Sequence, residues 1–80
     1  MGTGYRQPMP DPRRYRQIYA ALSQRISSGA VEPGARLNIA LLADEFGVGR
    51  DTVQHALVLL EEDGLIERWP GLGWYVSGEA

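Results

Sequence analysis

The sequence contains no cysteine and no lysine, and its 80 residues include one histidine and one phenylalanine. Without cysteine the chain forms no disulfide, binds no metal through a thiolate and has no cysteine nucleophile. Secreted domains of this size commonly depend on disulfides, so the composition favours an intracellular, cytoplasmic location. No unbroken apolar run is longer than Ala56–Leu60, whereas a membrane helix needs roughly 20 apolar residues, and we expect no signal peptide and no membrane partner.

The short length limits the fold and the chemistry together. Eighty residues form one small domain with a modest core and little room for a deep substrate pocket. The apolar share of 44%, with two tryptophans and four tyrosines, is typical of a folded domain. No residue pattern predicts an enzyme, a metal site or a cofactor, because the serines lack a neighbouring histidine and no phosphate-binding glycine loop precedes a helix.

All basic residues are arginines, and the charge is unevenly distributed. The formal net charge of −2 argues mildly against a nucleic-acid partner. However, residues 1–36 contain six arginines and two acidic residues, for a net charge of +4, and residues 37–80 contain two arginines and eight acidic residues, for a net charge of −6. Such an asymmetry indicates an interaction surface, although coding bias also explains a chain that uses only arginine.

The first third of the chain predicts a tail followed by a helix. Residues 1–11 contain several glycines and prolines and few apolar groups, so we expect a flexible tail. Asp11 is suited to cap a helix that begins at Pro12, where the missing N–H costs nothing. Apolar residues then recur at helical spacing from Tyr15 onwards, and Gly29 is expected to end the helix in a left-handed conformation.

Two further helices and a hairpin are predicted after this segment. Asn38 is expected to cap a helix that ends at Gly47, and a third helix runs from about residue 50 to residue 63. Strands are predicted at residues 65–69 and 73–76, joined by a type II turn at residues 69–72, and a short strand near residues 36–37 can join them. The expected fold is mainly α with a small β part, a winged helix-turn-helix over residues 12–77 with a C-terminal tail at residues 78–80.

The spacing of small and apolar residues between the second and third helices predicts a helix-turn-helix. Ala43 is small where two helices approach closely, and Gly47 allows the turn four residues later. Val53 and Ala56-Leu57 then anchor the third helix against the second. In such folds the exposed N-terminal face of the third helix enters the major groove of DNA.

Several stretches together resemble one family. They are Pro33-Gly34-Ala35-Arg36-Leu37, Leu42-Ala43-Asp44-Glu45-Phe46-Gly47-Val48, Thr52-Val53, Glu62-Asp63-Gly64-Leu65-Ile66 and Gly73-Trp74-Tyr75-Val76. Over about residues 13–77 the sequence resembles the DNA-binding domain of the GntR-type bacterial transcription regulators. The resemblance implies a winged helix that binds double-stranded operator DNA as a homodimer. In that family a ligand-binding and dimerisation domain normally follows, and no such effector domain is evident in these residues.

The resemblance also implies which residues of the third helix contact DNA. Arg50 and Thr52 match positions that contact bases or phosphate in the family. Gln54 lies where a second arginine is usual, and its amide suits adenine. Gly49 replaces a serine or threonine and so lacks a side-chain contact to phosphate. His55 is predicted either to fill the surface or to contact a base.

At the predicted wing, Gly71 and Gly73 match the family, and Leu72 lies where a basic residue is common. Three arginines of the first helix, Arg13, Arg14 and Arg16, are predicted either to contact phosphate or to act as solubilising charges. Trp69 and Trp74 flank the turn, and we expect them to stack as a cross-strand pair.

An alternative function follows from the same residues. The acidic second half, the missing contact arginines and the exposed aromatic residues are also consistent with a winged helix that binds another protein and has weak or no affinity for DNA.

Overall fold

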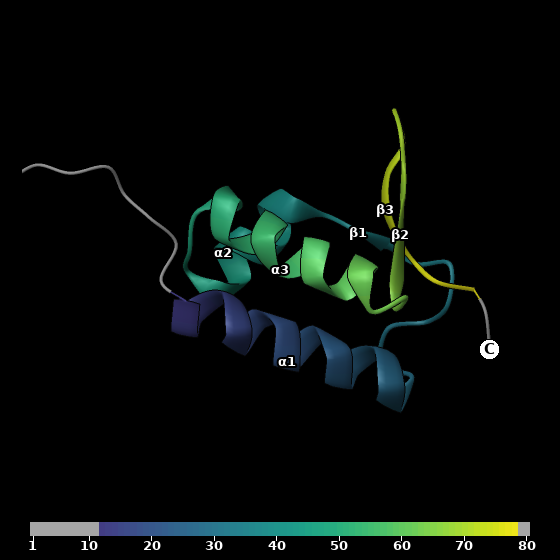
Figure 1. Ribbon diagram of the computed structural model, residues 1–80, viewed down its shortest axis with the longest axis horizontal. Helices are drawn as coiled ribbons and strands as arrows, with labels where there is room; N and C mark the ends of the chain where they lie inside the picture. Colours follow the sequence, from purple (N-terminus) through teal and green to yellow (C-terminus); the bar gives the residue numbers. More distant parts are fainter. Residues whose placement is uncertain (1–11, 79–80) are drawn as a thin grey trace, which may run out of the picture.

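The helices and strands occur in the predicted order in a computed structural model that describes residues 12–78 (Figure 1). The elements are α1 (Pro12–Ser28), β1 (Arg36–Leu37), α2 (Ile39–Phe46), α3 (Arg50–Glu62), β2 (Ile66–Trp69) and β3 (Gly73–Val76). The predicted flexible tail, the Asp11 cap and the last two residues lie outside the described residues.

Local capping signals set the helix boundaries. The Asn38 side chain accepts a hydrogen bond of 3.0 Å from the Leu41 amide, as predicted for a helix N-cap. Gly47 ends α2 with a φ of +66°, a conformation that glycine adopts without steric cost. Gly29, with a φ of +85°, follows α1. These three predictions are confirmed.

The sheet joins the wing to the segment that precedes α2. The strand order is β1-β3-β2, and both pairings are antiparallel. Leu37 lies opposite Trp74, so the short strand expected near residues 36–37 is present and the wing hairpin is part of a three-stranded sheet. The Gly34 amide donates to the Val76 carbonyl at 2.9 Å, and the Val76 amide donates to the Ala35 carbonyl at 2.8 Å. The start of α2 and the base of the wing are therefore tied together by backbone hydrogen bonds.

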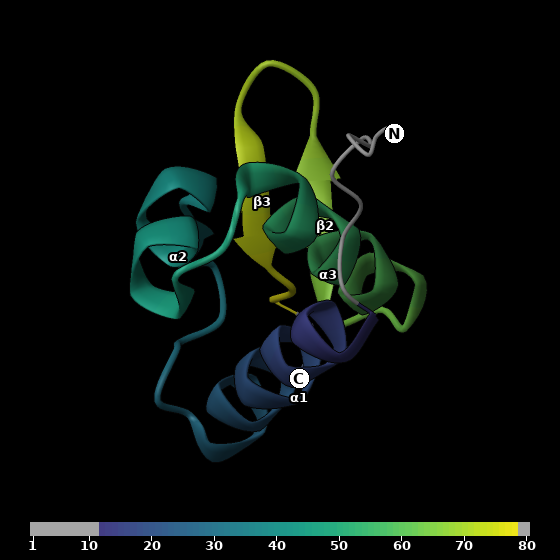
Figure 2. The ribbon, with the colours of Figure 1, turned by 90° about the vertical axis from the view of Figure 1, so that its left-hand side faces the viewer.

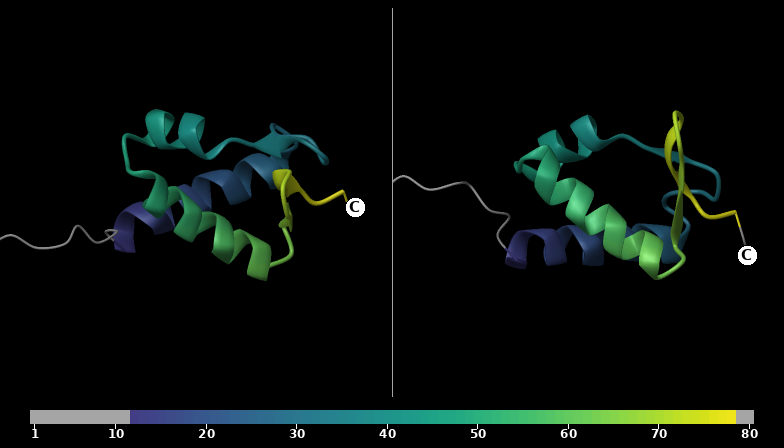
Figure 3. Two further views of the ribbon diagram at one scale, coloured as in Figure 1. Left: turned by 90° about the horizontal axis from the view of Figure 1, so that it is seen from above. Right: turned by 45° about the horizontal axis from the view of Figure 1, so that its top comes forward.

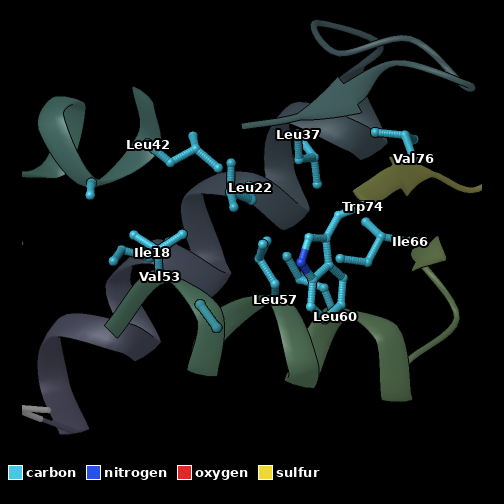
Figure 4. Packing of buried hydrophobic residues seen from close by; sticks show 12 residues of the cluster. Ile18, Leu22, Leu37, Leu42, Val53, Leu57, Leu60, Ile66, Trp74 and Val76 are labelled. Atoms are coloured by element: carbon cyan, nitrogen blue, oxygen red, sulfur yellow. The ribbon is translucent and has the colours of Figure 1, made fainter. Parts of the chain in front are cut away.

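The core lies between α1, α3 and the inner face of the sheet. α1 and α3 cross and pack against each other, while α2 covers the first half of α3 (Figure 3). The Trp74 indole lies among Leu57, Leu60 and Ile66 at the junction between α3 and the sheet (Figure 4). The buried apolar residues are Ile18, Leu22, Leu37, Leu42, Ala43, Val53, Ala56, Leu57, Leu60, Ile66, Trp74 and Val76. Within residues 12–78, none of the helices has the length and apolar character that crossing a membrane requires.

Candidate nucleic-acid interface

One face of α3 is fixed in the core, and the opposite face is open. The buried face consists of Thr52, Val53, Ala56, Leu57 and Leu60, which recur at helical spacing. The first two turns expose Arg50 and Gln54 on the other side. Because the buried face makes extensive contacts, the direction in which the exposed face points is fixed as well.

The turn before α3 leaves its N-terminus uncovered. The Val48 amide donates to the Ala43 carbonyl at 3.0 Å, which closes the turn of the helix-turn-helix. Gly49 is the N-cap residue in an extended conformation, and no side chain accepts a hydrogen bond from the first turn of α3. Within residues 12–78, the Arg50 guanidinium has no ion-pair or hydrogen-bond partner. This end of the helix combines a positive side chain with free backbone N–H groups.

Thr52 differs from the other predicted contacts of α3, because its side chain belongs to the buried face. Only 8% of the residue is exposed, compared with the open positions of Arg50 and Gln54. Its β-branched side chain therefore helps to pack the first turn of α3.

His55 is exposed and lies against α1. Its ring stacks on Tyr15, with the ring centroids 3.9 Å apart and an angle of 20° between the ring planes. The imidazole thus joins α3 to α1. The residues that the structure describes contain no group of three histidine, aspartate or glutamate side chains placed to hold a metal ion.

Arg14 connects α1 to the end of α2. Its Nη2 donates to the Phe46 carbonyl oxygen at 2.8 Å, and the side chain is half-buried. The last carbonyl groups of a helix lack hydrogen-bond partners within the helix and carry partial negative charge. A guanidinium group supplies both a hydrogen-bond donor and a positive charge.

The loop of the wing is the predicted type II turn. The Leu72 amide donates to the Trp69 carbonyl at 2.9 Å, and Gly71 has a φ of +79°. Gly73 has a φ of +117°, and the Arg36 guanidinium lies so close that a Cβ at this position would be 3.3 Å from Nε. Figure 2 shows the loop and the start of α3 on one side of the molecule, with α1 on the other.

The expected pairing of the two tryptophans is wrong. Trp69 lies opposite Gly73, and Trp74 lies opposite Arg68, so the two indoles are on different faces of the sheet. Trp74 is 6% exposed and Trp69 is 51% exposed. The group that stacks on Trp74 is the Arg68 guanidinium, whose central carbon lies 4.8 Å from the ring centroid.

Comparison with known proteins identifies the same family as the sequence resemblance. Residues 14–76 match the family described as bacterial regulatory proteins, gntR family. The chain belongs to the gntR family. It is 43% identical over 53 residues to the uncharacterized HTH-type transcriptional regulator YdhC of Bacillus subtilis, a match that covers 66% of this chain and 24% of YdhC. It is 41% identical over 66 residues to the mannosyl-D-glycerate transport/metabolism system repressor MngR of Escherichia coli, covering 81% of this chain and 28% of MngR.

Solved structures of gntR-family proteins share the fold. A GntR family transcriptional regulator from Listeria monocytogenes superimposes with a TM-score of 0.77 at 29% identity, over 94% of this chain and 64% of that one. AraR(DBD) in complex with operator ORE1 superimposes with a TM-score of 0.75 at 27% identity, over 96% of this chain and 89% of that one. The chain spans about a quarter of the length of the two curated relatives.

Within this gntR-family domain, much of the acidic charge is engaged away from the start of α3. Asp63 accepts a hydrogen bond from the Tyr19 hydroxyl, which raises the pKa of Tyr19 above its ordinary value of 10.0. It lies 13 residues along the chain from Arg50, or about 20 Å at the rise of an α-helix. Glu61 lies 3.5 Å from Arg68. Asp63 and Glu61 are therefore engaged at the far end of α3, whereas the exposed Asp51 lies in its first turn beside Arg50.

Two arginines at the base of the wing did not emerge from the sequence as site residues. Arg36 lies on the outer face of the sheet against Gly73, and Arg68 lies on the inner face over Trp74. The alternation of side chains along β2 and β3 carries the signal for Arg68, but only once the strand register is known.

Proposed function

We propose that this chain is a sequence-specific, DNA-binding transcriptional regulator that places α3 in the major groove and the wing at the minor groove or the adjacent backbone. The observation that carries the proposal is the open N-terminal half of α3, which presents Arg50 and Gln54 while its other face is held in the core. The similarity to AraR(DBD), a domain in complex with operator ORE1, supports DNA binding by this fold.

The side chains of α3 suit base recognition. An arginine donates two parallel hydrogen bonds to O6 and N7 of guanine, and a glutamine pairs with N6 and N7 of adenine. Arg50 and Gln54 lie four residues apart, about one helical turn, so they reach neighbouring base pairs. Gly49 leaves the first N–H groups of α3 open to a phosphate.

Two copies are proposed to bind as a homodimer on two-fold related half-sites, in the cytoplasm. A single domain of this size makes few phosphate contacts, and a second half-site adds the contacts that tight binding needs. Sedimentation of the chain with duplexes that contain one or two half-sites measures the stoichiometry.

The test begins with selection from a randomised duplex library at low salt, followed by fluorescence polarisation on the selected duplex. Arg50→Ala is expected to weaken binding by about 1–3 kcal/mol and to relax the preference at one base pair. Arg16→Ala is the matched control, because Arg16 is an exposed arginine on α1. Equal affinities for the Arg50 and Arg16 variants would remove Arg50 from the interface.

A second candidate function, recognition of another protein, is favoured by the exposed side chains of Trp69 and Leu72 on the wing. The same library distinguishes the two functions. If the chain binds no duplex at micromolar concentration and low salt, the protein-interaction function replaces DNA binding.

A further inference from the structure

The wing ends in an uncharged, apolar surface. Residues 69–75 contain no charged side chain. Leu72 is 60% exposed, and together with Trp69 and Tyr75 it lines a shallow hollow of about 320 Å³. We call these three residues the apolar tip. An exposed cluster of apolar side chains is a candidate contact surface, whereas single exposed leucines are common.

Hydrogen bonds within the wing orient the side chains of the apolar tip. The Tyr75 hydroxyl donates to the Leu72 carbonyl at 3.3 Å, and the Trp69 Nε1 donates to the Glu67 carboxylate at 3.2 Å. Ser77 donates to the other oxygen of Glu67 at 3.3 Å, so this carboxylate is already engaged. In the sheet register Arg36 and Glu67 lie on either side of Tyr75. What remains open on the tip is the apolar surface itself.

A second copy of the chain is a poor occupant for this part of the wing. β2 is an edge strand, and paired residues in a sheet point to the same face. In a two-fold antiparallel pair of β2 strands both copies keep their cores on the same side of the sheet, so the registers that pair three residues place Glu67 opposite Glu67 or Arg68 opposite Arg68. Like charges directly opposite each other destabilise such a pair.

The start of α3 lies on the same side of the molecule as the wing loop (Figure 2). DNA bound by α3 would therefore offer the apolar tip a surface of matching chemistry. Phosphates require cations, which the tip lacks, whereas the walls of the minor groove are built from the apolar faces of deoxyribose. Leucine is among the apolar side chains that enter the minor groove in other DNA-binding proteins. Arg36, on the exposed outer face at the base of the wing, is available to a flanking phosphate, whereas Arg68 is already paired with Glu61.

We propose that the apolar tip packs into the minor groove beside the α3 site and that Leu72 selects against guanine there. This inference rests on the proposed function. The guanine 2-amino group is the donor that distinguishes G·C from A·T in the minor groove. A leucine side chain cannot accept its hydrogen bond, and a buried donor without a partner is costly. The apolar tip thus selects A·T pairs through the minor groove, while α3 reads the major groove.

The test changes only the minor groove. Two variants of the selected duplex are prepared. The first has 2,6-diaminopurine in place of adenine, which adds the 2-amino group and keeps the major-groove edge. The second has inosine in place of guanine, which removes the 2-amino group. The wild-type chain is expected to bind the diaminopurine duplex about fivefold or more weakly than the natural one. Leu72→Ala is expected to lose most of this difference. Leu41→Ala is the matched control, because Leu41 is a similarly exposed leucine on α2, and it is expected to keep the difference.

A salt titration gives an independent readout. Leu72→Ala is expected to weaken binding by the same factor at every salt concentration, whereas Leu72→Arg is expected to steepen the salt dependence by about 0.9 per subunit through one new phosphate contact. Circular dichroism of each variant checks that the fold is intact. If the wild-type chain binds all three duplexes equally, or if Leu72→Ala keeps the diaminopurine penalty, the inference is overturned. Loss of all DNA binding by the wild type would instead overturn the proposed function.

Discussion

Arg14 offers a direct choice between a DNA contact and a structural role. Its guanidinium donates a hydrogen bond of 2.8 Å to the carbonyl oxygen of Phe46, which lies 32 residues away in the sequence. A hydrogen bond from a charged group contributes about 1.5–3 kcal/mol when buried. A cation at a helix C-terminus contributes about 0.3–1 kcal/mol. Because the side chain is half-buried, we expect Arg14→Ala to lower the free energy of unfolding by about 1–2 kcal/mol.

This loss is large enough to measure in a domain of 80 residues. Each kcal/mol shifts the Tm of such a domain by about 4–8 °C, so the Tm of Arg14→Ala should fall by about 5–15 °C in a circular dichroism melt. Arg16→Ala, on the exposed side of the same helix, should change it little. Salt titrations of DNA binding, made well below both melting temperatures, should give equal slopes for the two variants. An unchanged Tm together with a salt slope reduced by about 0.9 would refute this reasoning and make Arg14 a phosphate contact.

Three further predictions concern stability. Leu57→Ala should lower the free energy of unfolding by about 3–5 kcal/mol through loss of packing around a fully buried side chain, whereas Leu41→Ala should change it by less than about 0.5 kcal/mol, as measured by urea unfolding. Asn38→Ala should cost about 1 kcal/mol, and Asn38→Ser should restore most of it. The Arg25 guanidinium lowers the pKa of Glu45 below its ordinary value of 4.5. The ion pair therefore stabilises the fold above about pH 4.5, and this stabilisation is lost as the pH falls through the lowered pKa. Glu45→Gln should flatten the dependence of the free energy of unfolding on pH in this range.

The helices could be predicted from sequence because their ends are marked by local chemistry. Asn38 caps α2 with its own side chain, and Gly47 ends it in a conformation that other residues avoid. Such signals involve residues a few positions apart. The helix-turn-helix followed for the same reason, since the spacing from Ala43 to Val53 fixes which faces are buried.

The wing register could not be read in the same way. The expected pair of Trp69 and Trp74 would leave four residues between the two partners. In the structure three residues separate Trp69 from its partner Gly73, and this difference of one residue places Trp74 on the inner face. A shift of one position exchanges the two faces of a strand, so an error in loop length reverses every side chain beyond it. The left-handed Gly73 makes the shorter loop possible.

The candidate site was only partly predictable because several of its side chains are occupied by distant partners. Arg14 bonds to Phe46, and His55 stacks on Tyr15, which lies on another helix. Neither partner follows from local spacing. Gly49, Arg50 and Gln54 needed no such information, because they lie opposite a buried stripe that the sequence already defined.

The pairing of β1 with β3 has a consequence for the geometry of the DNA site. β1 immediately precedes α2, so the strand that returns from the wing is bonded to the backbone that leads into the helix-turn-helix. These hydrogen bonds couple the wing to the helix-turn-helix, so we expect the two proposed contacts on DNA to keep a fixed helical phase. One inserted base pair rotates the duplex by about 34°, given a repeat of about 10.5 base pairs per turn. A single insertion between the two contacted segments would therefore turn one of them away from the protein.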